Sequence, residues 1–337
     1  MATPHSPAPR PPASWPELKK ILGILGLLVF VCVATALMSD RFLTPYNLEN
    51  LVRRTALFGI LSVGVAFVII TGGIDLSIGS VVCLVGVGLP WLLTSVGLPL
   101  PVALLVVVLA SLGIGLAHGL LITQLRIQPF VVTLCGLLIY RGATRGFTSD
   151  QTMGFGNQYK TLRLLATGEV PLLPGFGLPV PCLILAVVAV LAAVFLNRTI
   201  YGRYLLALGR NEEAARYSGI PTRGLIVLAY VISAGLAGLG GTLFVLDVNS
   251  AQPVDFGNFY ELYAIAAAVL GGCSLRGGQG TILGVILGAA LMQVLRNMIT
   301  LVDWLPDHIE FAIIGAVILG GVAVDELVKR WAARRRA

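Results

Sequence analysis

The sequence predicts an all-α polytopic membrane protein with about ten transmembrane helices. Apolar residues make up 57% of the 337 residues and charged residues 12%, against about 25% charged residues in soluble domains. The mean hydropathy is +0.91. Glycine occurs 40 times, as expected where membrane helices approach each other closely through small residues. This composition excludes a soluble globular protein.

Apolar runs long enough to cross a bilayer recur along the chain. The expected spans are residues 21–38, 55–71, 78–97, 100–123, 129–147, 179–197, 224–246, 260–273, 281–300 and 308–324. The first run is longer than the roughly 7–15 residues of a signal-peptide core, so we expect a retained helix and not a cleaved signal. The fifth carries Arg141 and Arg145, and the eighth is short; either is alternatively a half-helix that does not cross. The count therefore lies between about eight and eleven.

The tails and loops set the expected domain limits. Residues 1–18, rich in Pro and Ala, are expected to form a disordered cytoplasmic tail. Residues 19–325 form the transmembrane domain, with one sizeable internal cytoplasmic loop at 198–223, and residues 326–337 form a basic cytoplasmic tail. Residues 148–178 are a long outer loop for which no fold is predicted.

The charge distribution predicts the orientation. With the N-terminus inside, most of the 23 Lys and Arg residues fall in inside segments, in agreement with the positive-inside rule. Both termini are therefore predicted to be cytoplasmic. The formal net charge of +7 is explained by these basic loops, so membrane lipid and no nucleic acid is expected around the chain.

A polar interruption at residues 71–80 separates two apolar stretches, 56–70 and 81–93. Its candidate functional residues are Gly72, Gly73, Asp75 and Ser77. An Asp near the centre of a membrane helix costs roughly 2.5–3.5 kcal/mol on insertion scales, so Asp75 is expected to face protein or a water-filled cavity. Its carboxylate is expected to accept backbone amide hydrogen bonds at the start of the next helix. The alternative is a tight turn at the membrane surface, with Asp75 capping the second helix.

A second interruption, at residues 271–280, has the same layout. A short apolar helix is followed by Gly-Gly, a polar break with one charge and one serine, small residues and a long helix. The candidate residues are Gly271, Gly272 and Ser274. Glycine-interrupted hydrophobic segments at corresponding positions of two halves indicate a transport site. The two breaks together favour a lined cavity over a surface turn.

The loop at 198–223 contains the signals of one short helix. Asn211 is suited to cap the helix start, and Glu213 complements the positive end of its dipole. Gly219 can adopt the left-handed conformation that ends a helix, and Pro221 blocks its continuation. A helix this short is not stable alone in water and needs a surface to dock against. That surface is either the chain's own membrane domain or another protein.

Three stretches carry a resemblance to a known family. They are residues 71–80, TGGIDLSIGS; residues 213–220, EAARYSGI; and the second break, GGCSL followed by Gly-Gly at 277–278. In this order they resemble the signatures of sugar-type ABC importer permeases, the ribose, xylose and arabinose kind, which are related to branched-chain amino acid permeases. Cys273 stands where that family more often has a small or hydroxyl residue. The resemblance covers about residues 20–325.

The resemblance implies a permease subunit of a bacterial inner-membrane importer. Such subunits work in pairs, dock on an ABC ATPase subunit on the cytoplasmic side, and receive a sugar from an extracytoplasmic binding protein. It implies alternating access, with Asp75 and Ser77 in the core near the pathway and a coupling helix held in a cleft of the ATPase. The implied ATPase-coupling residues are Asn211, Glu213, Ala214, Ala215 and Gly219. The apolar contacts with the ATPase are expected from Ala214, Ala215 and Ile220.

Other classes of function lack their sequence signals. No G-x-x-x-x-G-K-[ST], H-E-x-x-H or G-x-S-x-G motif occurs, so no catalytic residue, no cofactor and no ATP hydrolysis is expected in this chain. The five cysteines and three histidines lack metal-ligand spacing. His118 is expected to be a satisfied buried imidazole and not a proton relay.

The alternative function is a secondary transporter or channel for a small polar solute, built on the same broken helices. It requires intramembrane carboxylates for ion coupling, and Asp75 is the one strong candidate. It also gives the capped cytoplasmic helix no purpose. A structural membrane subunit leaves both polar breaks unexplained.

Overall fold

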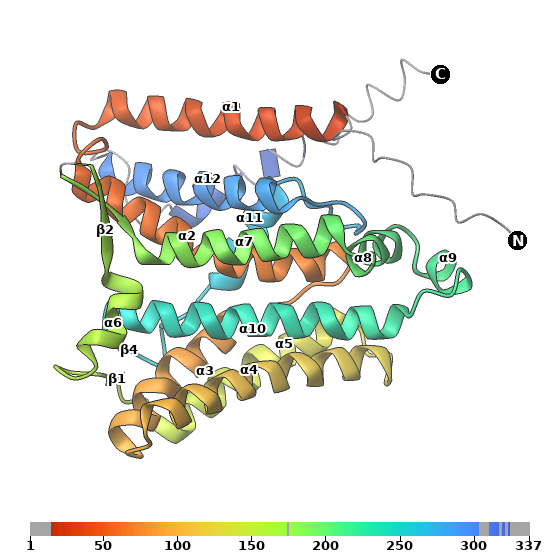
Figure 1. Ribbon diagram of the computed structural model, residues 1–337, viewed down its shortest axis with the longest axis horizontal. Coiled ribbons are helices and arrows are strands. Elements are labelled where there is room, and N and C mark those ends of the chain that lie inside the picture. The colour runs from red at the N-terminus through yellow and green to blue at the C-terminus, as the bar shows by residue number, and fades with distance from the viewer. Residues whose placement is uncertain (1–14, 174, 303–309, 317–318, 321–322, 324–337) are drawn as a thin grey trace, which may run out of the picture.

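The computed structural model describes residues 15–173, 175–302, 310–316, 319–320 and 323. In this part of the chain long helices lie side by side, and short helices and strands cover the two ends of the bundle (Figure 1). We call the end that carries α8 and α9 the α9 end. The opposite end, which carries strands β2 and β3, is the hairpin end (Figure 1).

The described part of the chain is mainly helical, with four short strands. The helices are α1 Trp15–Met38, α2 Pro45–Ile70, α3 Ile78–Pro90, α4 Leu100–Thr123, α5 Pro129–Thr148, α6 Lys160–Thr167, α7 Val180–Arg198, α8 Ile200–Arg210, α9 Glu212–Tyr217, α10 Thr222–Val248, α11 Tyr260–Leu270 and α12 Ile282–Leu301. A π-helical turn, Trp91–Ser95, extends α3. The strands are β1 Met153–Gly154, β2 Glu169–Leu173, β3 Phe176–Pro179 and β4 Ser250–Ala251. Strand β1 pairs antiparallel with β4, and β2 pairs antiparallel with β3.

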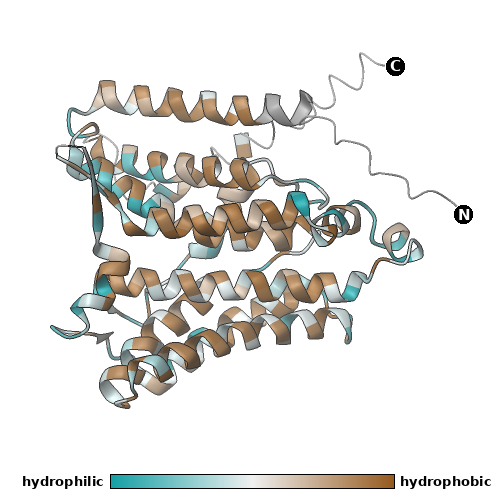
Figure 2. Cartoon of the chain, viewed as in Figure 1, coloured by the Kyte–Doolittle hydropathy of each residue, from teal (hydrophilic) through white to brown (hydrophobic). Residues whose placement is uncertain are grey.

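The structure confirms the predicted class of an all-α polytopic membrane protein. Seven of the described helices are long and apolar enough to cross a membrane: α1, α2, α3 with its π-turn, α4, α7, α10 and α12. Apolar residues run along their length (Figure 2). α5 fills the fifth predicted span but is not among these seven, and α11, in the eighth, has only 11 residues. The sequence had marked these two spans as uncertain, because the fifth contains two arginines and the eighth is short.

Three predictions reach beyond the described residues. α1 begins at Trp15, inside the predicted tail 1–18, and the first 14 residues of that tail lie outside the described part. The predicted tail 326–337 lies outside it entirely. Part of the tenth predicted span, 308–324, also lies outside it.

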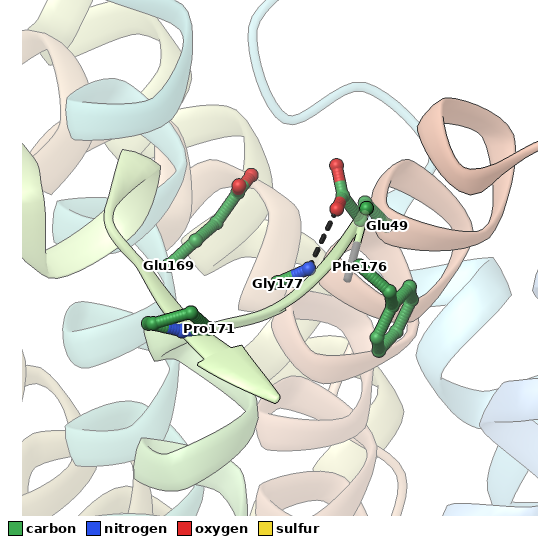
Figure 3. A pocket seen from close by; sticks show the side chains of 6 residues that line it. Glu49, Glu169, Pro171, Phe176 and Gly177 are labelled. Carbon is green, nitrogen blue, oxygen red and sulfur yellow. Dashed lines mark hydrogen bonds between the residues drawn. The ribbon is translucent and has the colours of Figure 1, made fainter. Parts of the chain in front are cut away.

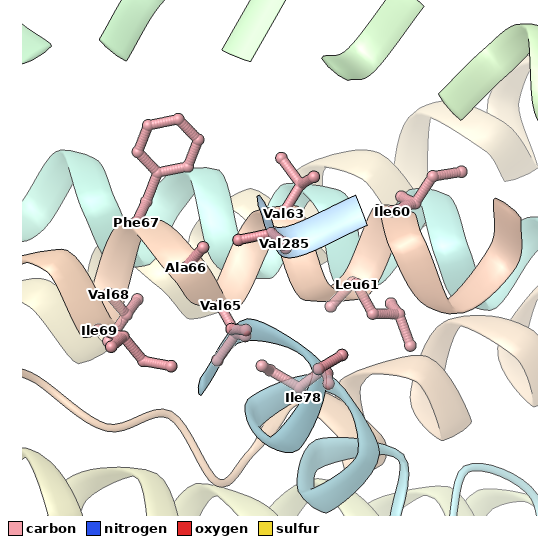
Figure 4. Packing of buried hydrophobic residues seen from close by; sticks show 14 of the residues in the cluster. Ile60, Leu61, Val63, Val65, Ala66, Phe67, Val68, Ile69, Ile78 and Val285 are labelled. Atoms are coloured by element: carbon pink, nitrogen blue, oxygen red, sulfur yellow. The ribbon is translucent and has the colours of Figure 1, made fainter. Parts of the chain in front are cut away.

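Helix α2 is the centre of the bundle. Every residue from 56 to 70 is buried. A helix that is apolar on all sides must be surrounded by other elements, and α10, α12, α11 and α7 pack around it. Figure 4 shows side chains leaving α2 in several directions, with Ile78 of α3 and Val285 of α12 beside them. The end of α2, where the first break begins, is therefore held on several sides.

Helices α4 and α10 approach each other through glycines spaced by four residues. A Cβ added to Gly115 would lie 2.7 Å from the Val231 Cα, and one added to Gly119 would lie 2.6 Å from the Val227 Cα. Small residues at this spacing let membrane helices pack backbone to backbone. The contact fixes α10 against α4 at the level of the polar groups described below.

The outer loop 148–178, for which the sequence predicted no fold, forms much of the hairpin end. It contains β1, α6, β2 and β3. Charges join it to the bundle, since Arg53 of α2 forms an ion pair with Glu169 and the Arg163 Nε donates to the Leu246 carbonyl of α10 at 3.0 Å. The Gly177 amide donates to the Glu49 carboxylate at 2.7 Å. These contacts link residues far apart in sequence, which local patterns do not reveal.

Candidate functional site

The first break begins where α2 ends, at the α9 end of the bundle. Residues 71–77 are not helical, and α3 begins at Ile78. Gly72 has a φ of +83°, a left-handed conformation that favours glycine. A Cβ on Gly73 would lie 2.8 Å from the Tyr230 hydroxyl. The first glycine therefore makes the turn, and the second allows α10 to come close.

Asp75 lies at the centre of this break and is 1% exposed. Its Oδ1 accepts hydrogen bonds from the Ser77 amide at 3.0 Å and the Ser77 hydroxyl at 2.7 Å. Its Oδ2 accepts from the Ser233 hydroxyl of α10 at 2.9 Å. The prediction that Asp75 faces protein and accepts an amide hydrogen bond before the next helix is confirmed. A surface turn does not fit a carboxylate buried against α10.

A shell of polar groups surrounds the break. The Ile74 carbonyl accepts a hydrogen bond from the Tyr230 hydroxyl of α10 at 3.1 Å. Next to it, the His118 Nε2 of α4 and the Tyr140 hydroxyl of α5 are 2.8 Å apart. Within the described residues the His118 Nδ1 has no hydrogen-bond partner. The imidazole is thus satisfied at one nitrogen only, and three helices contribute polar side chains to the surroundings of the break.

The second break has a related backbone. α11 ends at Leu270, and α12 begins at Ile282. Gly272 has a φ of +90°, while a Cβ on Gly271 would lie 2.7 Å from the Val285 Cα of α12. Each Gly-Gly pair therefore combines one left-handed residue with one crowded Cβ position, which a tyrosine hydroxyl crowds in the first break and the α12 backbone crowds in the second. The Ser274 amide donates to the Gln279 carbonyl at 3.1 Å and closes the loop on itself.

The two breaks touch each other. The Gly278 amide of the second break donates to the Ile70 carbonyl at the end of α2, at 2.8 Å. A Cβ on Gly277, whose φ is +84°, would lie 3.0 Å from the Gly72 nitrogen. The sequence predicted that the two segments have the same layout. Their contact is a finding of the structure.

We expect valine at Gly72, Gly73, Gly271 or Gly272 to damage folding far more than valine at Gly23 or Gly26. The first four have a left-handed φ or a crowded Cβ position, whereas a Cβ at Gly23 or Gly26 meets no atom of the described residues within 4 Å. Strain of about 1–3 kcal/mol per site is expected in the first set. The measurement is the yield and melting temperature of detergent-purified protein. Equal tolerance in both sets would contradict the assigned geometry.

Two charged residues that the sequence reading did not assign to the site lie on the hairpin side of the first break. Glu261, at the start of α11, is 8% exposed, and a Cβ on Gly79 of α3 would collide with its carboxylate. The Arg141 Nη1 of α5 donates to the Pro253 carbonyl at 3.1 Å and to the Phe256 carbonyl at 2.6 Å. An acidic residue at the head of a short apolar segment was an available signal for Glu261. Nothing in the sequence indicated that Arg141 would donate to the carbonyls of Pro253 and Phe256.

The predicted short helix in loop 198–223 is α9, with both predicted caps. The Asn211 side chain accepts from the Ala214 amide at 2.9 Å. Gly219 has a φ of +79°. The Ile220 amide donates to the Ala215 carbonyl at 3.1 Å and the Gly219 amide to the Arg216 carbonyl at 3.0 Å, the two hydrogen bonds of a Schellman ending.

The two faces of α9 differ. Ala215 is 5% exposed and packs with its own chain, as does Ile220 in part. Ala215 therefore holds α9 on the bundle, and Ile220 is half-buried. Direct contact of these residues with a partner stays a prediction. The outward face carries Ala214 and Tyr217, the latter 83% exposed.

An open hollow of about 350 Å³ lies at the hairpin end (Figure 3). Glu49, Glu169, Pro171, Gly175, Phe176 and Gly177 line it. Both of its carboxylates already have partners, Gly177 and Arg53. It lies near the start of α2, about 30 Å along that helix from the first break at 1.5 Å per residue. We do not assign the candidate site to it.

A bundle of apolar helices, with glycine turns between α2 and α3 and between α11 and α12, is the architecture of a multi-pass membrane protein. Comparison with known proteins agrees. Residues 47–322 match the family of the permease component of branched-chain amino acid transport systems, and the chain belongs to this family. It is thus a multi-pass inner-membrane protein of the permease class and not an enzyme.

Several curated relatives are similar along most of their length. The ribose import permease protein RbsC of Escherichia coli K12 is 36% identical over 307 residues, which cover 90% of this chain and 92% of the relative. RbsC of Bacillus subtilis 168 is 34% identical over 309 residues, covering 91% and 93%. The xylose transport system permease protein XylH of Haemophilus influenzae Rd is 29% identical over 368 residues, covering 92% and 96%. No solved structure matched the chain.

Proposed function

We propose that this chain is the membrane-spanning permease subunit of an ATP-driven importer that carries a monosaccharide by alternating access. One observation carries the proposal: the similarity to ribose import permeases extends over 90% of the chain and so includes both breaks and α9. The absence of a phosphate-loop motif from the sequence requires that ATP hydrolysis occurs in a separate ABC ATPase. A secreted sugar-binding protein would deliver the substrate on the other side.

The proposal assigns a side of the membrane to each end of the bundle. The α9 end is cytoplasmic, because the basic loop 198–223 belongs to it and inside loops are rich in Lys and Arg. The hairpin end then faces the binding protein. In this arrangement both termini are cytoplasmic. The candidate translocation core is the pair of breaks, with Gly72, Gly73, Asp75, Ser77, Gly271, Gly272 and Ser274.

Reconstitution tests the function directly. The chain is purified with an ABC ATPase and a sugar-binding protein from the same organism and placed in proteoliposomes with radiolabelled ribose, xylose, arabinose, glucose or leucine. We expect uptake of a monosaccharide that requires both ATP and the binding protein. Uptake by the chain alone, driven by a proton or sodium gradient, would establish the secondary transporter instead. Uptake of leucine in place of sugar would contradict the substrate class.

The outward face of α5 supports a homodimer as the working unit. α5 packs mainly on α3 and is not apolar enough to count as a membrane span. Its exposed side carries Cys135, Gly142 and Gly146. A Cβ at either glycine would meet no other atom of the described residues within 4 Å. Glycines four residues apart on a free face are typical of helix association in membranes, and a second copy of the chain is the proposed occupant.

We therefore expect Gly142→Trp to disrupt the dimer, because a large side chain prevents two α5 backbones from approaching. Gly113→Trp is the matched control, since Gly113 is also exposed, lies on α4 and also has open space around its Cβ. Native mass spectrometry or cross-linking in membranes measures the dimer fraction. If Gly142→Trp and Gly113→Trp dimerise equally well, α5 is not the interface.

A further inference from the structure

We infer that Gly209, Gly277 and Gly278 are positioning residues that join the ATPase-docking helix to both breaks at one point, which we call the glycine junction. This inference rests on the proposed function, because it concerns how docking on α9 reaches the candidate translocation core. Its basis is the packing of the last turn of α8 against the end of α2 and the loop of the second break.

Gly209 occupies the space between the two breaks. A Cβ added to Gly209 would collide with both the Ile70 carbonyl oxygen and the Gly278 nitrogen. These two atoms are themselves hydrogen-bonded to each other at 2.8 Å. The residue is therefore pressed against the hydrogen bond that links the end of α2 to the second break. No other amino acid fits there without moving backbone.

The second break meets α8 through backbone as well. A Cβ on Gly277 would lie 2.7 Å from the Gly209 oxygen, and one on Gly278 would lie 2.8 Å from the Arg210 nitrogen. Both glycines have left-handed φ values, +84° and +72°. Apart from the Arg210 Cγ, with which a Cβ on Gly278 would also collide, the contact is between backbone atoms, and close-packed backbone transmits a displacement. A shift of α8 must therefore move the second break or break the contact.

The connection from α8 to α9 is one residue long. α8 ends at Arg210, and Asn211 caps α9 through the Ala214 amide at 2.9 Å. The Asn211 amide also donates to the Ala207 carbonyl of α8 at 3.2 Å. Asn211 thus bonds to both helices, so that a force applied to α9 acts on the end of α8. Figure 1 shows α8 between the bundle and the projecting α9.

Helix α8, which adjoins the docking helix α9, thus contacts both breaks directly. Movement of α9 against the ATPase would reach Gly209 through α8, and from there the Ile70 end of the first break and the loop of the second. One input would thus act on two segments that are far apart in sequence. This gives the glycines at all three positions a common role, in addition to the left-handed φ values that Gly277 and Gly278 adopt.

The test is the substitution Gly209→Ala in the reconstituted complex, with Gly224→Ala as the control. Gly224 lies in the first turn of α10 near the same end of the bundle, is exposed, and its Cβ would meet no described atom within 4 Å. The assay uses whichever of ribose and xylose the unaltered complex imports and records both uptake and ATP hydrolysis. We expect Gly209→Ala to retain ATPase capture and hydrolysis while the sugar imported per ATP falls about tenfold or more. Gly224→Ala should keep the unaltered ratio.

If Gly209→Ala caused a general folding defect, ATP hydrolysis and sugar uptake would fall together. In that case a measurement on the unaltered complex tests the inference. Hydrogen exchange is compared with and without a non-hydrolysable ATP analogue, in peptides covering 68–76, 205–212 and 271–282. We expect protection in all three to change together. Exchange that changes in 205–212 alone, or a Gly209→Ala complex with an unaltered sugar-to-ATP ratio, overturns the inference. If the unaltered complex imports no sugar, the proposed function itself has failed.

Discussion

Replacing Asp75 with alanine is expected to abolish most transport and to reduce the amount of folded protein in the membrane. The carboxylate accepts three hydrogen bonds, two from Ser77 and one from Ser233. Alanine leaves three buried donors without an acceptor, at about 1–3 kcal/mol each. It also removes the hydrogen bond from Ser233, which ties this side chain of the first break to α10, so the start of α3 loses an anchor. We expect sugar uptake to fall by at least about tenfold, since 1.4 kcal/mol corresponds to one decade.

Asparagine at the same position separates the role of hydrogen bonding from that of charge. Asp75→Asn keeps one carbonyl oxygen for the Ser77 donors, and the Ser233 hydroxyl can rotate to accept from the new amide. We expect this variant to keep substantial uptake. Ser233→Ala, which loses a single contact, should cost about 1 kcal/mol. The measurements are uptake in vesicles and the melting temperature of the purified chain. Full uptake by Asp75→Ala would refute the assignment, and an Asn variant as inactive as Ala would show that the negative charge itself is required.

Local signals in the sequence predicted the parts of the site whose geometry depends on a few neighbouring residues. The two ends of α9 were predictable from Asn211 and Gly219, because helix capping depends on side-chain and φ preferences within one turn. Asp75 lies buried because a carboxylate among apolar residues must find donors in protein. The seven apolar spans follow from composition and length in the same way.

The rest depends on contacts between distant segments, which a single sequence does not encode locally. Ser233 lies within a long apolar helix, and nothing near it in sequence indicates that it meets Asp75. Gly209 reads as an ordinary glycine near a helix end, and only the fold brings it against Ile70 and Gly278. Ala215 was assigned to the partner because small apolar residues on a docking helix suit close approach. In the structure the same property packs it against its own chain.

The division of α9 into two faces changes which residue tests the docking proposal. Gly219 needs a left-handed φ, so any side chain there disturbs the end of the helix as well as a partner surface. Ala215 is buried in the chain's own core. Tyr217 is 83% exposed, and the guanidinium carbon of Arg216 lies 5.7 Å from the centre of its ring. An exposed aromatic residue beside an arginine is typical of the centre of a protein interface.

Tyr217→Ala is expected to weaken capture of the ATPase about thirtyfold, corresponding to the roughly 2 kcal/mol lost when an interface tyrosine is truncated. The permease itself should fold, insert and dimerise normally, because the ring contributes nothing to the buried core. Tyr46→Ala is the matched control, since Tyr46 is 79% exposed and lies at the hairpin end, where α2 begins. Co-purification of the ATPase is measured for both variants, and ATP-dependent uptake in vesicles for Tyr217→Ala, beside the unaltered chain. Normal capture and uptake with Tyr217→Ala would leave α9 as a helix that packs only on its own bundle, whereas a defect confined to Tyr217→Ala places the ATPase on its outward face.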